Sequence, residues 1–176
     1  MSAWMLPFPE TAITCRHGVV DELHPRGHRG TDFGKGPAVK GAPIPVINRG
    51  RVVVSEWHEA LGNVVVVQHG SIKKFSYYCH LLEPGVPVGT VLEKAGEVLG
   101  KVGNTGRYSF GAHLHCGVSE HARGFESGIV EDIVKVVKEQ QALEKKAPAA
   151  PAAPAAPAVE SAPKAKPAAK TSAKAE

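Results

Sequence analysis

The sequence has few cysteines, few aromatic residues and no long hydrophobic run. Three cysteines in 176 residues are too few, and odd in number, for a disulfide framework. No Cys-x-x-Cys pair is present, which excludes a zinc ribbon and a thioredoxin-like site. No segment approaches the roughly 18 apolar residues of a membrane span, so no membrane insertion is expected. The first residues lack the basic and apolar regions of a secretory signal peptide, so we expect the protein to be kept at first in the cytosol.

The charge balance points to an anionic partner. The formal net charge is +4 and the isoelectric point is about 9.0, which suits a cell wall or a nucleic acid. No cluster of lysine and arginine is interleaved with aromatic residues, as a groove for a phosphate backbone requires. We therefore expect no nucleic-acid partner. Hydrophobic residues make up 43% of the chain, enough for one domain with a core.

Composition divides the chain into three parts. Residues 1–124 contain short segments rich in β-branched and aromatic residues, separated by glycine and proline, which predicts a mainly antiparallel β domain. Residues 125–146 carry apolar side chains at helical spacing and predict an amphipathic helix that packs on one end of the sheet. Residues 147–176 are mainly alanine, proline and lysine, and are expected to form a disordered tail.

Nine histidines are the most informative feature of the composition. His28 and Asp32 occur in the sequence HRGTD, where the glycine and the threonine favour a turn that runs into a strand. Neutral imidazole and carboxylate groups are ordinary zinc ligands. His113 and His115 flank a leucine, so in a strand both imidazoles face one side and the leucine faces the other. The spacing therefore predicts a site with two imidazoles from one strand.

A fifth candidate, His80, lies in the segment YYCHL. Strand alternation places Tyr78 and His80 on one face and Cys79 on the opposite face. A single histidine in a strand is usually structural. Its interest comes from the two other histidine patterns.

These patterns, in this order, resemble the lysostaphin-type (LytM-like) zinc metallo-endopeptidases. The resemblance rests on the segments HRGTDF (28–33), YCHL (78–81) and GAHLH (111–115). The intervening segment GNVVVVQHG (62–70) is similar to the family's central strand, and GEVLGKVGNTG (96–106) is similar to its glycine-rich approach to the last motif. The resemblance covers about residues 27–119. One departure is Cys116, where the family usually has an aromatic residue.

The resemblance assigns a role to each motif residue. It implies that His28, Asp32 and His115 bind one Zn²⁺ per chain, and that His80 and His113 form the catalytic pair. Three protein ligands leave a fourth tetrahedral position for water, as in catalytic zinc sites. Zinc would make that water more acidic, and the two histidines would handle its proton and the developing charge. Residues 1–124 would then be the metallopeptidase domain.

The implied function is hydrolysis of peptide bonds in bacterial peptidoglycan, in the stem peptide or the cross-bridge. The absence of a signal peptide favours a phage endolysin, released through a holin-type pore to lyse the host. The first alternative is a LytM-like module that binds or regulates without catalysis, since relatives that lack ligands act by protein contact. The sequence does not indicate an oligomeric state.

The remaining histidines are expected to have other roles. Glu56-Trp57-His58 is similar to the end of the motif in D-Ala-D-Ala carboxypeptidase-type zinc enzymes, which is a lesser alternative. That family separates its first histidine and aspartate by more residues than lie between His28 and Asp32. His69 follows a buried valine run and is expected to be structural. The other three lie in polar stretches and are expected to be solvated: His17, His24 and His121.

Overall fold

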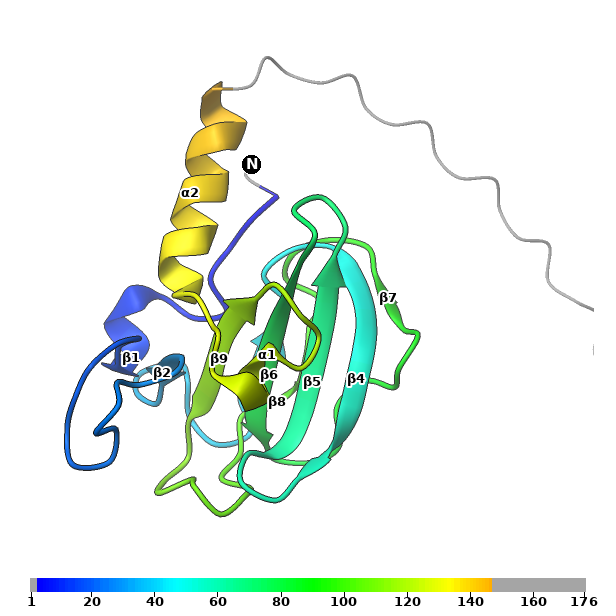
Figure 1. Ribbon diagram of the computed structural model, residues 1–176. Coiled ribbons are helices and arrows are strands. Elements are labelled where there is room, and N and C mark those ends of the chain that lie inside the picture. The colour runs from blue at the N-terminus through cyan, green and yellow to red at the C-terminus, as the bar shows by residue number, and fades with distance from the viewer. Residues whose placement is uncertain (1–2, 147–176) are drawn as a thin grey trace, which may run out of the picture.

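The computed structural model describes residues 3–146 and shows a twisted antiparallel sheet with a helix beyond one edge (Figure 1). The main sheet has seven strands in the order β1-β2-β9-β6-β5-β4-β7. These strands are β1 (Ile13–Cys15), β2 (Thr31–Phe33), β4 (Gly50–His58), β5 (Gly62–His69), β6 (Lys74–Leu81), β7 (Val91–Leu92) and β9 (Leu114–Ser119). A separate pair joins β3 (Pro43–Pro45) to β8 (Val98–Lys101). The predicted mainly antiparallel β fold is confirmed, while the predicted disordered tail, residues 147–176, lies outside the described residues.

The four valines in β5 explain how the sheet is built. Val65 and Val67 pack into a large core, and Val64 and Val66 pack into a smaller core on the opposite face. Side chains alternate along a strand, so an uninterrupted valine run requires a sheet that is covered on both faces. The second face is covered by the segment after β9, where Phe125 is buried.

The predicted helix over residues 125–146 is wrong in its first part. The structure has a short helix α1 (Gly124–Ser127), then Gly128 in a left-handed conformation (φ 74°), and then α2 (Ile133–Lys146). Between the helices Glu131 forms a β-bridge with Val118, so the chain returns to the sheet edge before α2 begins. Ile129, which the helical pattern would bury, is 68% exposed.

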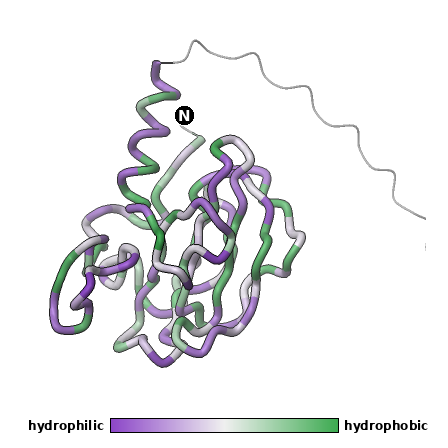
Figure 2. Tube along the Cα trace, in the orientation of Figure 1, coloured by the Kyte–Doolittle hydropathy of each residue, from purple (hydrophilic) through white to green (hydrophobic). Residues whose placement is uncertain are grey.

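Helix α2 buries apolar side chains in its first two turns, and its later part contacts the N-terminal segment through Gln141, which donates to the Trp4 carbonyl (2.9 Å). Ile133, Val134, Val136 and Val137 are buried with Phe8 and other residues of the N-terminal segment. Hydrophobic and hydrophilic residues alternate along the helix in Figure 2, in agreement with this one-sided burial. Within residues 3–146, no helix has both the length and the apolar composition that crossing a membrane requires.

Candidate metal and catalytic site

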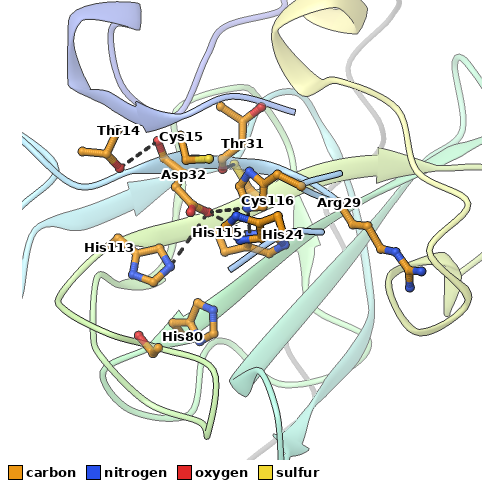
Figure 3. Close-up of polar contacts among 12 residues, drawn as sticks. Thr14, Cys15, His24, Arg29, Thr31, Asp32, His80, His113, His115 and Cys116 are labelled. Atoms are coloured by element: carbon orange, nitrogen blue, oxygen red, sulfur yellow. Dashed lines mark hydrogen bonds and ion pairs between the residues drawn. The ribbon is translucent and has the colours of Figure 1, made fainter. Parts of the chain in front are cut away.

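The five residues singled out by the sequence line one groove on one face of the main sheet. Figure 3 shows Asp32, His80, His113 and His115 in this groove. Asp32 in β2 lies directly opposite His115 in β9, because these strands pair antiparallel. His28 precedes β2 in the loop of residues 16–30, His80 lies near the end of β6, and His113 immediately precedes β9. The register of three neighbouring strands therefore sets the relative positions of these side chains.

Three of these side chains form a close triangle of electron-pair donors. His115 Nδ1 lies 2.8 Å from Asp32 Oδ1, and His28 Nε2 lies 3.1 Å from His115 Nδ1 and 3.2 Å from the same Asp32 oxygen. His28 Nδ1 donates a hydrogen bond to the Arg16 carbonyl (3.2 Å). When the ring is neutral, this bond leaves Nε2 with a lone pair directed at the other two atoms.

The triangle fits a zinc ion. In a tetrahedral site with zinc bonds of about 2.0–2.2 Å, two ligand atoms lie about 3.3–3.6 Å apart. The three sides observed here are 2.8, 3.1 and 3.2 Å, so a small outward shift of the side chains would admit the ion. Two imidazoles and one carboxylate are a common donor set for catalytic zinc. Three electronegative atoms at these distances need a cation or a shared proton between them.

Gly30 leaves the space that the His115 ring occupies. A Cβ atom at this position would lie 2.5 Å from His115 Cε1, 2.7 Å from its Nε2 and 3.0 Å from the Cys116 carbonyl oxygen. These distances are too short for any side chain. The glycine inside the HRGTD motif is thus required by the approach of β9 to the loop before β2.

The two remaining histidines lie beside the triangle with their rings 4.7 Å apart. His80 Nδ1 donates to the Thr105 carbonyl (2.7 Å) and His113 Nδ1 donates to the Gly111 carbonyl (2.8 Å). In both neutral rings Nε2 is therefore the free electron-pair donor. His113 Nε2 lies 3.8 Å from Asp32 Oδ1, the oxygen that forms one corner of the triangle.

The expected strand alternation fails at His80. Tyr78 packs in the large core, yet His80 contacts the rings of His113 and His115, which lie on the other face. The reason is the backbone, because His80 has φ 60°, in the left-handed region that non-glycine residues seldom adopt. Such conformations are found preferentially at functional sites. Gly103 packs against this bend, since a Cβ there would lie 2.6 Å from the His80 carbonyl oxygen.

The alternation predicted for the other motif is confirmed. Leu114 and Cys116 are fully buried in the large core, while His113 and His115 face Asp32. His113 itself precedes β9 and is held by an isolated bridge to Gly103.

Burial and the aspartate set the protonation of the site. Burial opposes ionisation of Asp32, but hydrogen bonds from His115 and His28 hold the pKa of its carboxyl far below the usual range. Burial also lowers the pKa of His28, yet its bond to Asp32 outweighs this effect and the net pKa is raised. Burial lowers the pKa of His115, and it lowers that of His80 to about 4. At neutral pH His80 is therefore an uncharged imidazole.

The five side chains lie in an open groove of about 820 Å³. Its walls carry aromatic rings, including the exposed side chains of Tyr108 and Phe110, and the basic side chains of Arg26 and Arg29. Its volume lies within the range of about 300–1,000 Å³ that is usual for ligand-binding pockets.

Three residues near the site were missed or misjudged from the sequence. The thiol of Cys15 lies close to His28 and Asp32, because Cys15 in β1 is the strand partner of Asp32. Asp21 lies beside this thiol, and so does His24. His24 is not a solvated loop residue as expected, since its ring packs 4.2 Å from that of His28. Only the pairing of β1 with β2 reveals this neighbourhood.

The other histidine expectations have mixed outcomes. His69 is structural as predicted, being fully buried between the Arg49 carbonyl (2.9 Å) and the Ser76 hydroxyl (2.7 Å). The Glu56-Trp57-His58 pattern does not form a metal site: Glu56 pairs with Arg123, and Trp57 is 60% exposed.

Comparison with known proteins identifies the family. The pattern of Peptidase family M23 matches residues 26–127, which include all five residues of the site. The chain belongs to this family. The predicted lysostaphin-type, LytM-like family is thereby confirmed.

Three similar proteins illustrate the range of the family. The chain is 36% identical over 100 residues to the peptidoglycan DD-endopeptidase ShyB of Vibrio cholerae, covering 57% of this chain and 22% of ShyB. It is 26% identical to the solved catalytic domain of lysostaphin from Staphylococcus simulans (TM-score 0.61; 72% of this chain, 91% of that domain). A zinc-containing peptidase from Vibrio cholerae is 31% identical (TM-score 0.54; 64% and 35%). The chain thus spans 22% of the length of the curated relative ShyB.

Proposed function

We propose that this chain is a zinc-dependent endopeptidase that hydrolyses peptide bonds in bacterial peptidoglycan. The observation that carries the proposal is the donor triangle of His28, Asp32 and His115, with His80 and His113 beside it in an open groove. The substrate class is supported by the similarity to ShyB, whose name describes a peptidoglycan DD-endopeptidase. A basic groove wall also suits stem peptides, which carry carboxylates.

The triangle supplies three protein ligands, which is the usual number in catalytic zinc sites. Zinc bound there would supply Lewis acidity, which polarises the scissile carbonyl group and makes the attacking water more acidic. The backbone orients one of the ligand rings, because His28 Nδ1–H donates to the Arg16 carbonyl and leaves Nε2 for the ion.

His80 and His113 are proposed to move the proton. Their Nδ1–H groups are bound by backbone carbonyls, so each ring offers Nε2 to the groove. One imidazole takes the proton of the attacking water, and the imidazolium then donates it to the leaving amine. The other ring accepts a hydrogen bond from the attacking water through Nε2, or, once protonated, donates one to the developing oxyanion.

The test compares the two histidines that flank Leu114. His115→Ala should lose zinc and wall hydrolysis together, because two protein ligands hold zinc poorly. His113→Ala should keep its zinc and its fold but lose hydrolysis by about 10²- to 10⁴-fold, as expected for a positioned acid–base group. His121→Ala, which changes an exposed histidine, is the control. Zinc is measured by elemental analysis, and hydrolysis by turbidity loss of purified cell walls.

The outcomes separate the proposal from its rivals. Loss of metal in His113→Ala with retention in His115→Ala would reverse the two roles. A parent protein that binds zinc and wall but never cleaves it would be a non-catalytic module instead. Mass spectrometry of the digested peptidoglycan identifies the bond that is cut.

Release during phage-driven host lysis, through a holin-type pore, stays a prediction from the sequence. It is tested by inducing the chain in host cells with and without a holin. Rapid lysis only when the holin is present would support it. Lysis in its absence would contradict the holin route.

A further inference from the structure

A second group of potential metal ligands lies next to the donor triangle and is not part of it. Cys15, Asp21 and His24 each place one ligand atom so that all three atoms lie within 4.8 Å of one another. Cys15 is the last residue of β1, and the other two lie in the loop of residues 16–30 that joins β1 to β2. Neither Asp21 nor His24 takes part in the proposed catalytic chemistry.

The backbone holds the three side chains in place. β1 pairs with β2 so that Cys15 lies opposite Asp32, which fixes the thiol at the rim of the site. Asp21 Oδ1 accepts the backbone N–H groups of Leu23 (3.0 Å) and His24 (2.7 Å), so the aspartate organises its own turn. The same oxygen lies 2.9 Å from His24 Nδ1, and the His24 ring packs on His28.

The chemistry of the group is that of a zinc-type site. A thiolate, an imidazole and a carboxylate are the three side-chain ligands that zinc uses, and the thiolate favours zinc over magnesium or calcium. Cys15 and His24 are half-buried and Asp21 is exposed, so an ion can enter from solvent. Burial raises the pKa of the Cys15 thiol, and the charges of Asp32 and Asp21 raise it further. A divalent cation would offset that repulsion and stabilise the thiolate.

We propose that Cys15, Asp21 and His24 bind a second thiophilic divalent cation, beside the ion of the donor triangle. The main competing arrangement is a thiolate bond to the first ion, because Cys15 also lies within 4.8 Å of ligand atoms of His28 and Asp32. The triangle already supplies three ligands, and a catalytic zinc keeps its fourth position open. Asp21 and His24 occur in the second group alone, whereas Cys15 lies close to both groups.

Cobalt is the probe, because thiolate bound to Co²⁺ gives a near-ultraviolet charge-transfer band. The reduced full-length chain is titrated with Co²⁺, and bound metal is measured by equilibrium dialysis. The parent should bind two equivalents and show the band. His115→Ala removes a triangle ligand and should bind one equivalent with the band retained. Cys15→Ser should bind one equivalent without the band.

Asp21→Asn and Glu22→Gln form a matched pair, since both remove one exposed carboxylate from the same turn. Asparagine keeps the oxygen that accepts the turn's N–H groups. Asp21→Asn should lower the affinity for the second Co²⁺ ion by about 10-fold or more. Glu22→Gln should leave the affinities for both ions unchanged. Circular dichroism confirms that each variant is folded.

Two results would overturn the second site. One is a parent that binds a single equivalent without the band. The other is a band that appears with the first equivalent and vanishes in His115→Ala, which would place the thiolate on the first ion. Wall hydrolysis is not a readout here, so failure of the catalytic proposal and failure of this one are distinguishable.

Discussion

Gly30→Ala tests how closely the loop before β2 fits the ring of His115. The added Cβ would lie 2.5 Å from His115 Cε1, about 0.9 Å short of the 3.4 Å at which ordinary contact begins. The ring is restrained because its Nδ1 lies 2.8 Å from Asp32 Oδ1, and the added Cβ is restrained because the Cys116 carbonyl oxygen lies 3.0 Å from its position. The loop or the ring must therefore shift by several tenths of an ångström.

Such a shift is large for a metal site, whose ligand distances are held within about 0.2 Å. Zinc affinity should fall by about 10- to 100-fold, the range seen when groups that orient a ligand are changed. The metal-free protein should also lose about 1–3 kcal/mol of unfolding free energy, as is typical of overpacking. Gly70→Ala is the control, because a Cβ there meets nothing within 4 Å.

Zinc affinity is measured by competition with a chromophoric chelator, and unfolding free energy by denaturant titration of the metal-free protein. Parent-like affinity in Gly30→Ala would refute the reasoning, because it would mean that His115 does not need its observed position to hold the ion. An equal loss in Gly70→Ala would show instead that any added methyl group in a loop perturbs the protein.

Two further predictions concern stability. Burial lowers the pKa of His69 below 6.5 in the folded protein, so the unfolded chain takes up the proton first. The stability that neutral His69 contributes is therefore complete above about pH 6.5 and is lost as the pH falls below that value. Denaturant titrations at about pH 7.5 and about pH 5.5 should show a smaller loss of unfolding free energy in His69→Gln than in the parent. Equal losses in the two proteins would contradict this. Tyr77→Phe removes the hydroxyl that donates to the Arg29 carbonyl (2.7 Å) and should lower the unfolding free energy by about 1 kcal/mol. Thermal unfolding measures the loss, with Tyr108→Phe as the control because Tyr108 is exposed. The argument fails if both variants melt like the parent.

The sequence predicts the strands that carry the site better than it predicts how they meet. The motifs of His28, Asp32 and His115 are local and carry a family resemblance, so these residues could be named in advance. The pairing of Asp32 with His115 brings together residues from distant parts of the chain. Only the register of β2 against β9 shows it, and alternation alone does not give that register.

Two failures of the sequence prediction share one cause. Helical spacing of apolar residues continues across Gly128, yet the left-handed glycine ends α1 and the chain forms a bridge to β9. Strand alternation continues through Tyr78 and Cys79, yet left-handed His80 turns its ring to the other face. In both places a single backbone conformation overrides a periodic pattern, because tertiary contacts outweigh local propensity.

Cys15 and His24 were missed for a different reason. Cys15 ends the three-residue strand β1, and His24 lies in the loop that follows it. Such a short strand leaves little periodic signal. The pairing of Cys15 with Asp32 is what turns an isolated cysteine into a neighbour of the site.

The carbonyl groups that orient three of the site histidines belong to the backbone of loop residues. Arg16 accepts from His28, Thr105 from His80 and Gly111 from His113, and each bond leaves Nε2 free. A backbone carbonyl remains present when the side chain of its residue is substituted. Accepting a hydrogen bond from a histidine therefore constrains the residue type at these positions only weakly. The position of the loop is constrained instead. A carbonyl that moves away no longer accepts a hydrogen bond from Nδ1–H, and the ring can then adopt the other tautomer. Changes of loop length within residues 16–30 or 102–112 should therefore alter the site more than most single substitutions there.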